Sequence, residues 1–130
     1  MTIEEQVLTI LSGFSAVTSL VPASRIKVPG NWQNLQRPYI VHFPVSPDAR
    51  HVHDDGLIQP GIWDFYQISV YADTYSQGRA VVKAIIANFR GQLAGGVTAF
   101  LQPGAFYMGR DDQMNVEHFA LNFRVAAGLS

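Results

Sequence analysis

The stretch from residue 62 to residue 89 constrains the fold most strongly, because its hydrophobic period changes once along its length. In "IWDFYQISVYAD" (62–73) apolar and polar residues alternate, which is typical of a β-strand. From residue 74 the apolar residues recur every three or four positions, which predicts an amphipathic helix. A strand that runs directly into a helix is therefore expected here.

The two periods also assign faces to this strand and helix. One face of the strand is expected to carry Tyr66, Ile68, Val70 and Ala72, and the other Phe65, Gln67, Ser69 and Tyr71. The apolar stripe of the helix consists of Val81, Val82, Ile85, Ile86 and Phe89, opposite Arg79, Lys83 and Arg90. Because both strand faces carry aromatic residues, the strand is predicted to be central in its sheet or to meet another chain with its second face.

Capping signals delimit two helices. Thr2 and Glu5 stand at the spacing of a capping box, which predicts a first helix over residues 2–14. Thr74 and Gln77 repeat this spacing at the start of the second helix. The glycines of "GQLAGG" accept the left-handed geometry in which helices end, so the second helix is expected to stop there.

The remaining strands are expected at 24–28, 39–45, 97–102, 105–110 and 115–126. The first of these is a candidate edge strand, and the last three are expected to be short. Pro44 indicates a bulge, an edge position or a strand end. This element order favours an α+β fold with a mainly antiparallel sheet and two helices packed on one face.

Length and composition exclude several classes of protein. A chain of 130 residues fits a single domain, 1–130. Nine basic and ten acidic residues give a net charge of -1, which provides no electrostatic attraction to nucleic acid or to an anionic membrane. With no cysteine, disulfides, thiolate zinc sites and a cysteine nucleophile are excluded. The amino terminus lacks a basic n-region, and no apolar run approaches the ~20 residues that span a bilayer, so a soluble chain made in the cytoplasm is expected.

The longest predicted loop, residues 46–61, holds the cluster that most resembles a site for chemistry. The polar residues of this cluster are Arg50, His51, His53, Asp54 and Asp55. In an extended segment the two histidines would share one face, and the aspartates would add oxygen ligands. A zinc site also needs a third ligand from a rigid support. A solvated loop tip, a metal site and a contact surface therefore all remain open.

Other polar groups favour structural roles. Asp111 and Asp112 lie in a predicted turn, where Arg110 is available to pair with them. His42 and His118 lie within predicted strands and are expected to be hydrogen-bonded there. Trp63 fits either a protein contact or the core. No phosphate-binding loop and no serine nucleophile elbow is present, so neither an enzyme nor a cofactor is expected.

Three segments together resemble the tail-completion or tail-terminator proteins of long-tailed bacteriophages. They are the opening "IEEQVLTILSGFSAVTSLV" with "SRIKVP", the strand "LQRPYIVHFPVS", and the strand–helix segment "YQISVYADTYSQGRAVVKAI". The resemblance spans residues 3–126 in the family's order. The chain departs from the family pattern at "RHVHDDG" and matches its closing strand only loosely at "FALNFRV".

This resemblance implies a structural virion protein, assembled in the host cytoplasm, that forms a ring at the head–tail joint. Such a ring, usually a hexamer, ends polymerisation of the tail tube and presents a docking surface to the head connector or stopper protein. DNA passes through its lumen without specific binding. Trp63, Phe65 and Tyr71 are the expected subunit interface, because a closed ring needs two complementary patches on each subunit. The 46–61 loop is the expected tube- or lumen-facing contact.

Three alternatives remain. The first is another neck or tail-tube component of the same particle. The second is a small metal-binding or hydrolase module centred on residues 50–56. The third is a small-ligand-binding α+β domain, which would need an apolar pocket with convergent polar groups that the sequence does not identify.

Overall fold

The computed structural model describes residues 2–30, 36–45, 61–104 and 106–127. Its helices are α1 (Ile3–Ser12), the one-turn α2 (Ser15–Thr18), α3 (Tyr75–Asn88) and the short 3₁₀ segments η1 (Ala23–Arg25) and η2 (Ala94–Gly96). Its strands are β1 (Ile26–Lys27), β2 (Tyr39–Pro44), β3 (Gly61–Ala72), β4 (Gly91–Gln92), β5 (Val97–Leu101), β6 (Tyr107–Asp111) and β7 (Val116–Ala127). The order confirms the predicted α+β class.

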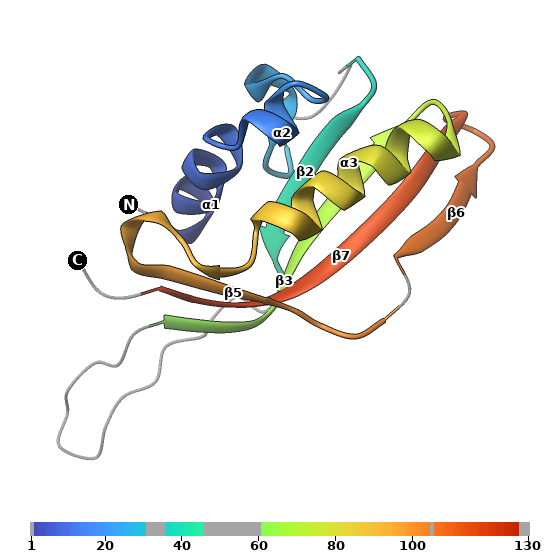
Figure 1. Cartoon of the computed structure of the whole chain (residues 1–130). Coiled ribbons are helices and arrows are strands. Elements are labelled where there is room, and N and C mark those ends of the chain that lie inside the picture. Colours follow the sequence, from blue (N-terminus) through green and yellow to red (C-terminus); the bar gives the residue numbers. More distant parts are fainter. Residues whose placement is uncertain (1, 31–35, 46–60, 105, 128–130) are drawn as a thin grey trace, which may run out of the picture.

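All seven described strands join one sheet, in which β7 is the central element. The path runs β1-β2-β3-β7-β5-β4, and β6 also pairs with β7. β7 meets β3 along one side, while β5 and β6 share its other side (Figure 1). Among the described strands, only β1 and β2 are parallel. The mainly antiparallel sheet, the edge position of residues 26–27 and the extent of the last strand are thus confirmed, although with twelve residues β7 is not a short strand.

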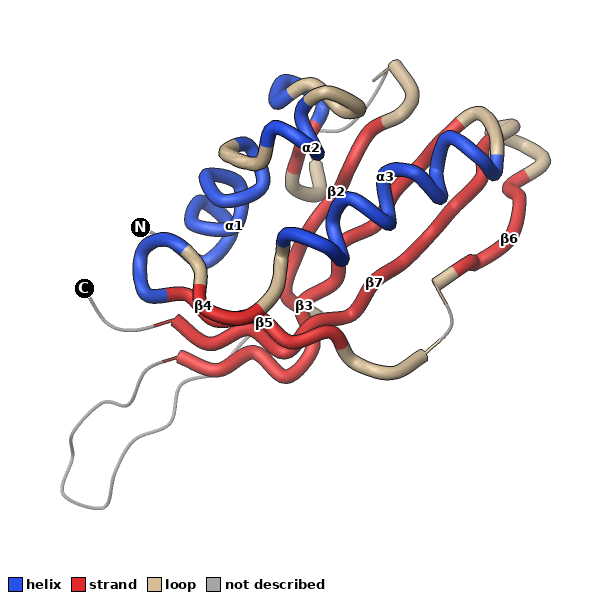
Figure 2. The backbone as a smooth tube through the Cα atoms, in the orientation of Figure 1, coloured by secondary structure: helices blue, strands red, loops and turns tan. Residues whose placement is uncertain are grey.

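The helices lie together on one face of the sheet (Figures 1 and 2). α1 contacts β1 and β2, whereas α3 contacts β3 and β7, so the two longer helices cover adjacent halves of the sheet. Among the described residues, no helix is both long enough and apolar enough to cross a membrane.

Both long helices begin as their capping residues predict. The Thr2 hydroxyl accepts from the Glu5 backbone N–H at 3.1 Å, and the Glu5 carboxylate accepts from the Thr2 N–H at 3.3 Å. At α3 the Thr74 hydroxyl accepts from the Gln77 N–H at 3.1 Å. Each cap satisfies backbone donors that have no partner inside the helix.

The core lies between the helices and the sheet, as the strand-like and helix-like hydrophobic periods of residues 62–89 predict. From β3 and β7 it takes Tyr66, Ile68, Val70, Phe119, Leu121, Phe123 and Val125. From α3 and its C-cap it takes Val81, Val82, Ile85 and Phe89, and from α1 Ile3, Val7, Ile10 and Leu11. Arg79, Lys83 and Arg90 are exposed, which agrees with their predicted position away from the stripe.

Candidate functional site

The sheet face opposite the helices is the first candidate contact surface. Register places on it the side chains that alternate with the core positions. In β2, β3, β7 and β5 this face includes Tyr39, Val41, Phe43, Gln67, Ser69, Tyr71, His118, Ala120, Asn122, Arg124, Thr98 and Phe100. Among these described positions there is no Asp, Glu or Lys. A solvated face of an antiparallel sheet normally alternates to charged and polar residues, so this composition is typical of a protein contact.

An aromatic ladder crosses this face near the carboxyl end of β3. Tyr71 stacks on Tyr39 at 4.9 Å between ring centroids and on His118 at 4.5 Å, with interplanar angles of 17° and 5°. The three residues are register neighbours on β2, β3 and β7. Burial lowers the pKa of His118 and raises that of Tyr71. The ladder therefore presents a rigid, uncharged platform near neutral pH.

The opposite end of the same face is more exposed. β3 contains a bulge between Trp63 and Tyr66, and the bulged residues lie opposite Arg124 of β7. Phe65 in this bulge is 53% exposed, and Phe100 of β5, the register partner of Arg124, is 60% exposed. Two exposed aromatic residues thus flank one cation.

The bulge separates the three residues predicted as a subunit interface. Phe65 is exposed and Tyr71 is half-buried in the aromatic ladder. Trp63 is half-buried and packs against the helix-side core, because the extra residue of a bulge shifts the alternation. The three side chains therefore do not form one continuous patch.

The five predicted loop residues, Arg50, His51, His53, Asp54 and Asp55, lie outside the described residues, as does the rest of 46–60. Within the described ranges, no group of three or more His, Cys, Asp or Glu side chains is placed to hold a metal ion. The metal hypothesis for residues 50–56 stays a prediction.

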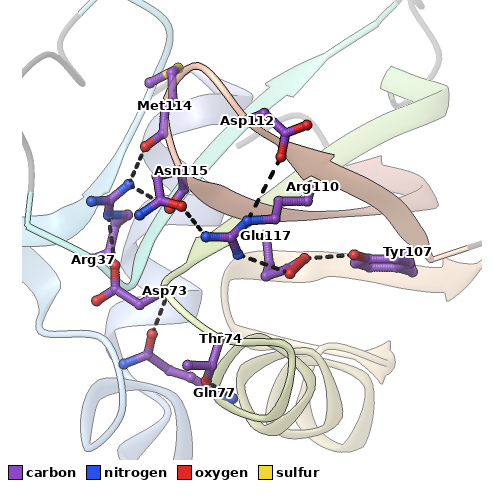
Figure 3. Close-up of polar contacts among 10 residues, drawn as sticks. All are labelled: Arg37, Asp73, Thr74, Gln77, Tyr107, Arg110, Asp112, Met114, Asn115 and Glu117. Carbon is purple, nitrogen blue, oxygen red and sulfur yellow. Dashed lines mark hydrogen bonds and ion pairs between the residues drawn. The ribbon is translucent and has the colours of Figure 1, made fainter.

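A polar network braces the strand–helix joint, and sequence reasoning did not predict it (Figure 3). Arg37 pairs with Asp73 at 3.0 Å and donates to the backbone carbonyls of Met114 and Asn115 at 2.7 and 3.2 Å. The Gln77 side chain accepts from the Asp73 N–H at 2.9 Å. One guanidinium thus ties the start of β2 to the β3–α3 joint and to the β6–β7 turn.

The β6–β7 hairpin carries a second polar cluster (Figure 3). The Tyr107 hydroxyl donates to Glu117 at 2.6 Å, and Arg110 donates to the other carboxylate oxygen at 3.1 Å. Arg110 also contacts Asn115 and lies 4.0 Å from Asp112. The hydrogen bonds from Tyr107 and Arg110 lower the pKa of Glu117.

The remaining candidate acid–base groups have structural partners. Asp111 accepts from the backbone N–H groups of Gln113 and Met114 at 3.0 and 3.2 Å, as its predicted turn role requires. His42 lies in the core with Nδ1 2.7 Å from the Tyr66 hydroxyl. Burial lowers the pKa of His42 to about 4 and raises that of Tyr66. This pair is a buried hydrogen bond between β2 and β3, as was predicted for His42. The same prediction is not met at His118, whose ring stacks on Tyr71 and whose buried Nε2 has no hydrogen-bond partner among the described residues.

Comparison with known proteins gives a likeness to a solved virion structure. No protein-family model matches the chain, and no curated protein matches it. A chain in the solved structure of the "virion of native gene transfer agent (GTA) particle" is similar to it, with a TM-score of 0.72 and 20% sequence identity. The match covers 98% of this chain and 95% of that one. At this identity the likeness establishes the shared fold.

Proposed function

We propose that this chain is a structural virion protein that forms a ring at the head-proximal end of a tail tube, where it ends tube polymerisation and joins the tail to the head. The observation that carries the proposal is the fold likeness to a virion chain over nearly the whole of both chains. The sequence resemblance to tail-terminator proteins, over residues 3–126, supports the position in the particle. The role requires no catalytic step, cofactor or membrane contact.

The sheet face opposite the helices supports an assembly role, and its exposed part is the end with Phe65 and Phe100, because Tyr39, Val41, Ser69 and Ala120 are buried. It combines the aromatic ladder with the exposed aromatic residues Phe65 and Phe100. Aromatic side chains bury large areas at low entropic cost and are enriched in protein interfaces. The four strands have 6, 12, 5 and 12 residues, and at ~4.8 Å between strands and up to ~3.4 Å per residue they give a face on the order of 600 Å². One partner in a stable complex buries an area of this size. Phe65 and Tyr71 are accordingly proposed as contacts between subunits.

Electrostatics are compatible with a DNA conduit. With a net charge of -1, the chain has no overall attraction to the phosphate backbone. In the proposed ring, DNA crosses the lumen without specific binding, while the tube protein and a stopper or connector protein occupy the two ends.

Deletion of the gene in particle-producing cells tests the function. The proposal predicts tubes of uncontrolled length together with heads that lack tails, and restoration of normal particles by the gene in trans. Tubes of normal length that fail to join heads would assign the chain to another neck component instead. Normal tails attached to heads would refute both assignments.

A further inference from the structure

An apolar edge strand lies at the amino-terminal end of α3. β6 pairs with β7, and in the described part of the chain its other edge has no strand partner. The ring of Tyr107 in β6 lies 5.1 Å from that of Tyr75 in the first turn of α3. Phe106, Met108 and Met114 are exposed, with Met108 at 57%. An edge strand with large exposed apolar side chains favours association with another chain.

This apolar strip, which consists of Phe106 and Met108, is followed by an acidic turn. Asp111 and Asp112 are both exposed, and the Asp112 side chain is 94% exposed. Arg110 pairs with Asp112 at 4.0 Å and also donates to Glu117. One cation thus accompanies three carboxylates, and the turn beside the strip carries an excess of negative charge.

A groove of complementary character lies at the other end of α3. Its volume is about 400 Å³, and its lining includes Ile86, Phe89 and Arg90 after the last turns of α3 and Ala99, Phe100 and Leu101 of β5. Arg90 is exposed at its rim. The groove is thus apolar, with one cation, Arg90, at its rim.

We propose that the apolar strip of one copy seats in the groove between α3 and β5 of a second copy, with Asp112 facing Arg90. The two features lie at opposite ends of a helix of fourteen residues, roughly 21 Å long at ~1.5 Å per residue, so one chain cannot fill its own groove. Unlike charges at the two surfaces fix the orientation of the contact. A contact between two different patches repeats head to tail and closes into a ring where the rotation permits.

This inference rests on the proposed ring and specifies a further contact between its subunits, in addition to Phe65 and Tyr71 of the sheet face. Because the chain has no cysteine, disulfide cross-links between introduced single cysteines report contacts without interference from native thiols. A Met108→Cys variant is mixed with a size-tagged Leu101→Cys variant at high concentration under mild oxidation, which traps even transient contacts. Leu101 lines the groove and pairs in register with the core residue Phe123. We expect the 108–101 heterodimer in excess over random pairing. The matched control replaces Met108→Cys with Leu20→Cys, which is exposed near the carboxyl end of α2. Random pairing in both mixtures would overturn the inference.

Charge reversal provides a second test by sedimentation across a dilution series and by electron microscopy of rings on tube ends. Arg90→Glu or Asp112→Arg alone should weaken association about tenfold, and an equimolar mixture of the two variants should restore it, because each interface then regains unlike charges. Asp111 is left unchanged because it caps the turn.

If single variants assemble rings as the wild type does, the inference fails while the proposed function stands. If cross-linking is specific but no ring forms on tubes, the contact stands and the proposed function fails.

Discussion

Gly78 of α3 lies directly against the ring of Phe119 on β7. A Cβ at Gly78 would stand 2.2 Å from Phe119 Cε1 and 2.8 Å from Cδ1, well inside van der Waals contact. The Phe119 ring is itself held by the rings of Tyr75 and Tyr107, with centroids at 5.4 and 5.2 Å. The close approach of α3 to the sheet, immediately after the strand–helix joint, therefore depends on glycine at this position.

Gly78→Ala should destabilise the protein by up to about 2 kcal/mol. Overpacking costs about 1–3 kcal/mol, and the higher helix propensity of alanine offsets about 1 kcal/mol of that cost. Chemical denaturation measures the difference. Ala80→Gly, at an exposed position of the same helix, controls for the intrinsic propensity. The loss should shrink in a Phe119→Leu background, and a Gly78→Ala protein more stable than wild type would contradict the contact.

Acid should destabilise the fold through His42. Its pKa of about 4 in the folded state is lower than the ~6.5 of an unfolded histidine. The unfolded state therefore binds a proton first, and stability is lost as the pH falls from about 6.5 to about 4, by about 3 kcal/mol in total. Denaturation across this range should show a smaller loss in His42→Gln, which does not titrate. Equal pH dependence in both proteins would exclude His42 as the cause.

Loss of Arg37 should loosen the joint and the hairpin turn together. Arg37→Met removes the ion pair with Asp73 and the two bonds to backbone carbonyls, and should cost about 1–2 kcal/mol. Asp73→Asn removes only a half-exposed ion pair and should cost less than about 1 kcal/mol. Hydrogen exchange checks the mechanism. Backbone amides near residues 114–116 should exchange faster in Arg37→Met than in the wild type, whereas their exchange rates should be unchanged in Asp73→Asn. The reverse pattern would be inconsistent with the network.

Periodicity predicts β3, α3 and the core face of β7 because each buries one side over several residues. Periodicity does not predict the bulge at Phe65, because a bulge needs only one extra residue and no distinctive composition. This bulge moves Trp63 to the core side. Periodicity also does not predict the hydrogen bond from Arg37 to Met114, because this bond joins residues 77 positions apart in the chain. The pairing of β7 with three strands is equally invisible, because alternation identifies the buried face of a strand and not its neighbours.

The two aromatic positions on β3 should separate stability from assembly. Because Phe65 is exposed, Phe65→Ser should change the free energy of unfolding by no more than about 0.5 kcal/mol. The same substitution should weaken subunit association. Trp63→Ala removes a side chain packed on the core and should cost on the order of 2 kcal/mol. Thermal denaturation and mass measurement on the same samples distinguish the two effects. Unchanged association in Phe65→Ser would remove it from the proposed interface.

The ring is the central claim, and direct imaging tests it most simply. Purified protein is examined by negative-stain electron microscopy, alone and with tail tubes of its particle, while its mass is measured across a dilution series. We predict rings of uniform mass, either free in solution or at one end of each tube. Protein that stays monomeric at every concentration and leaves tube ends bare at saturation would contradict the account.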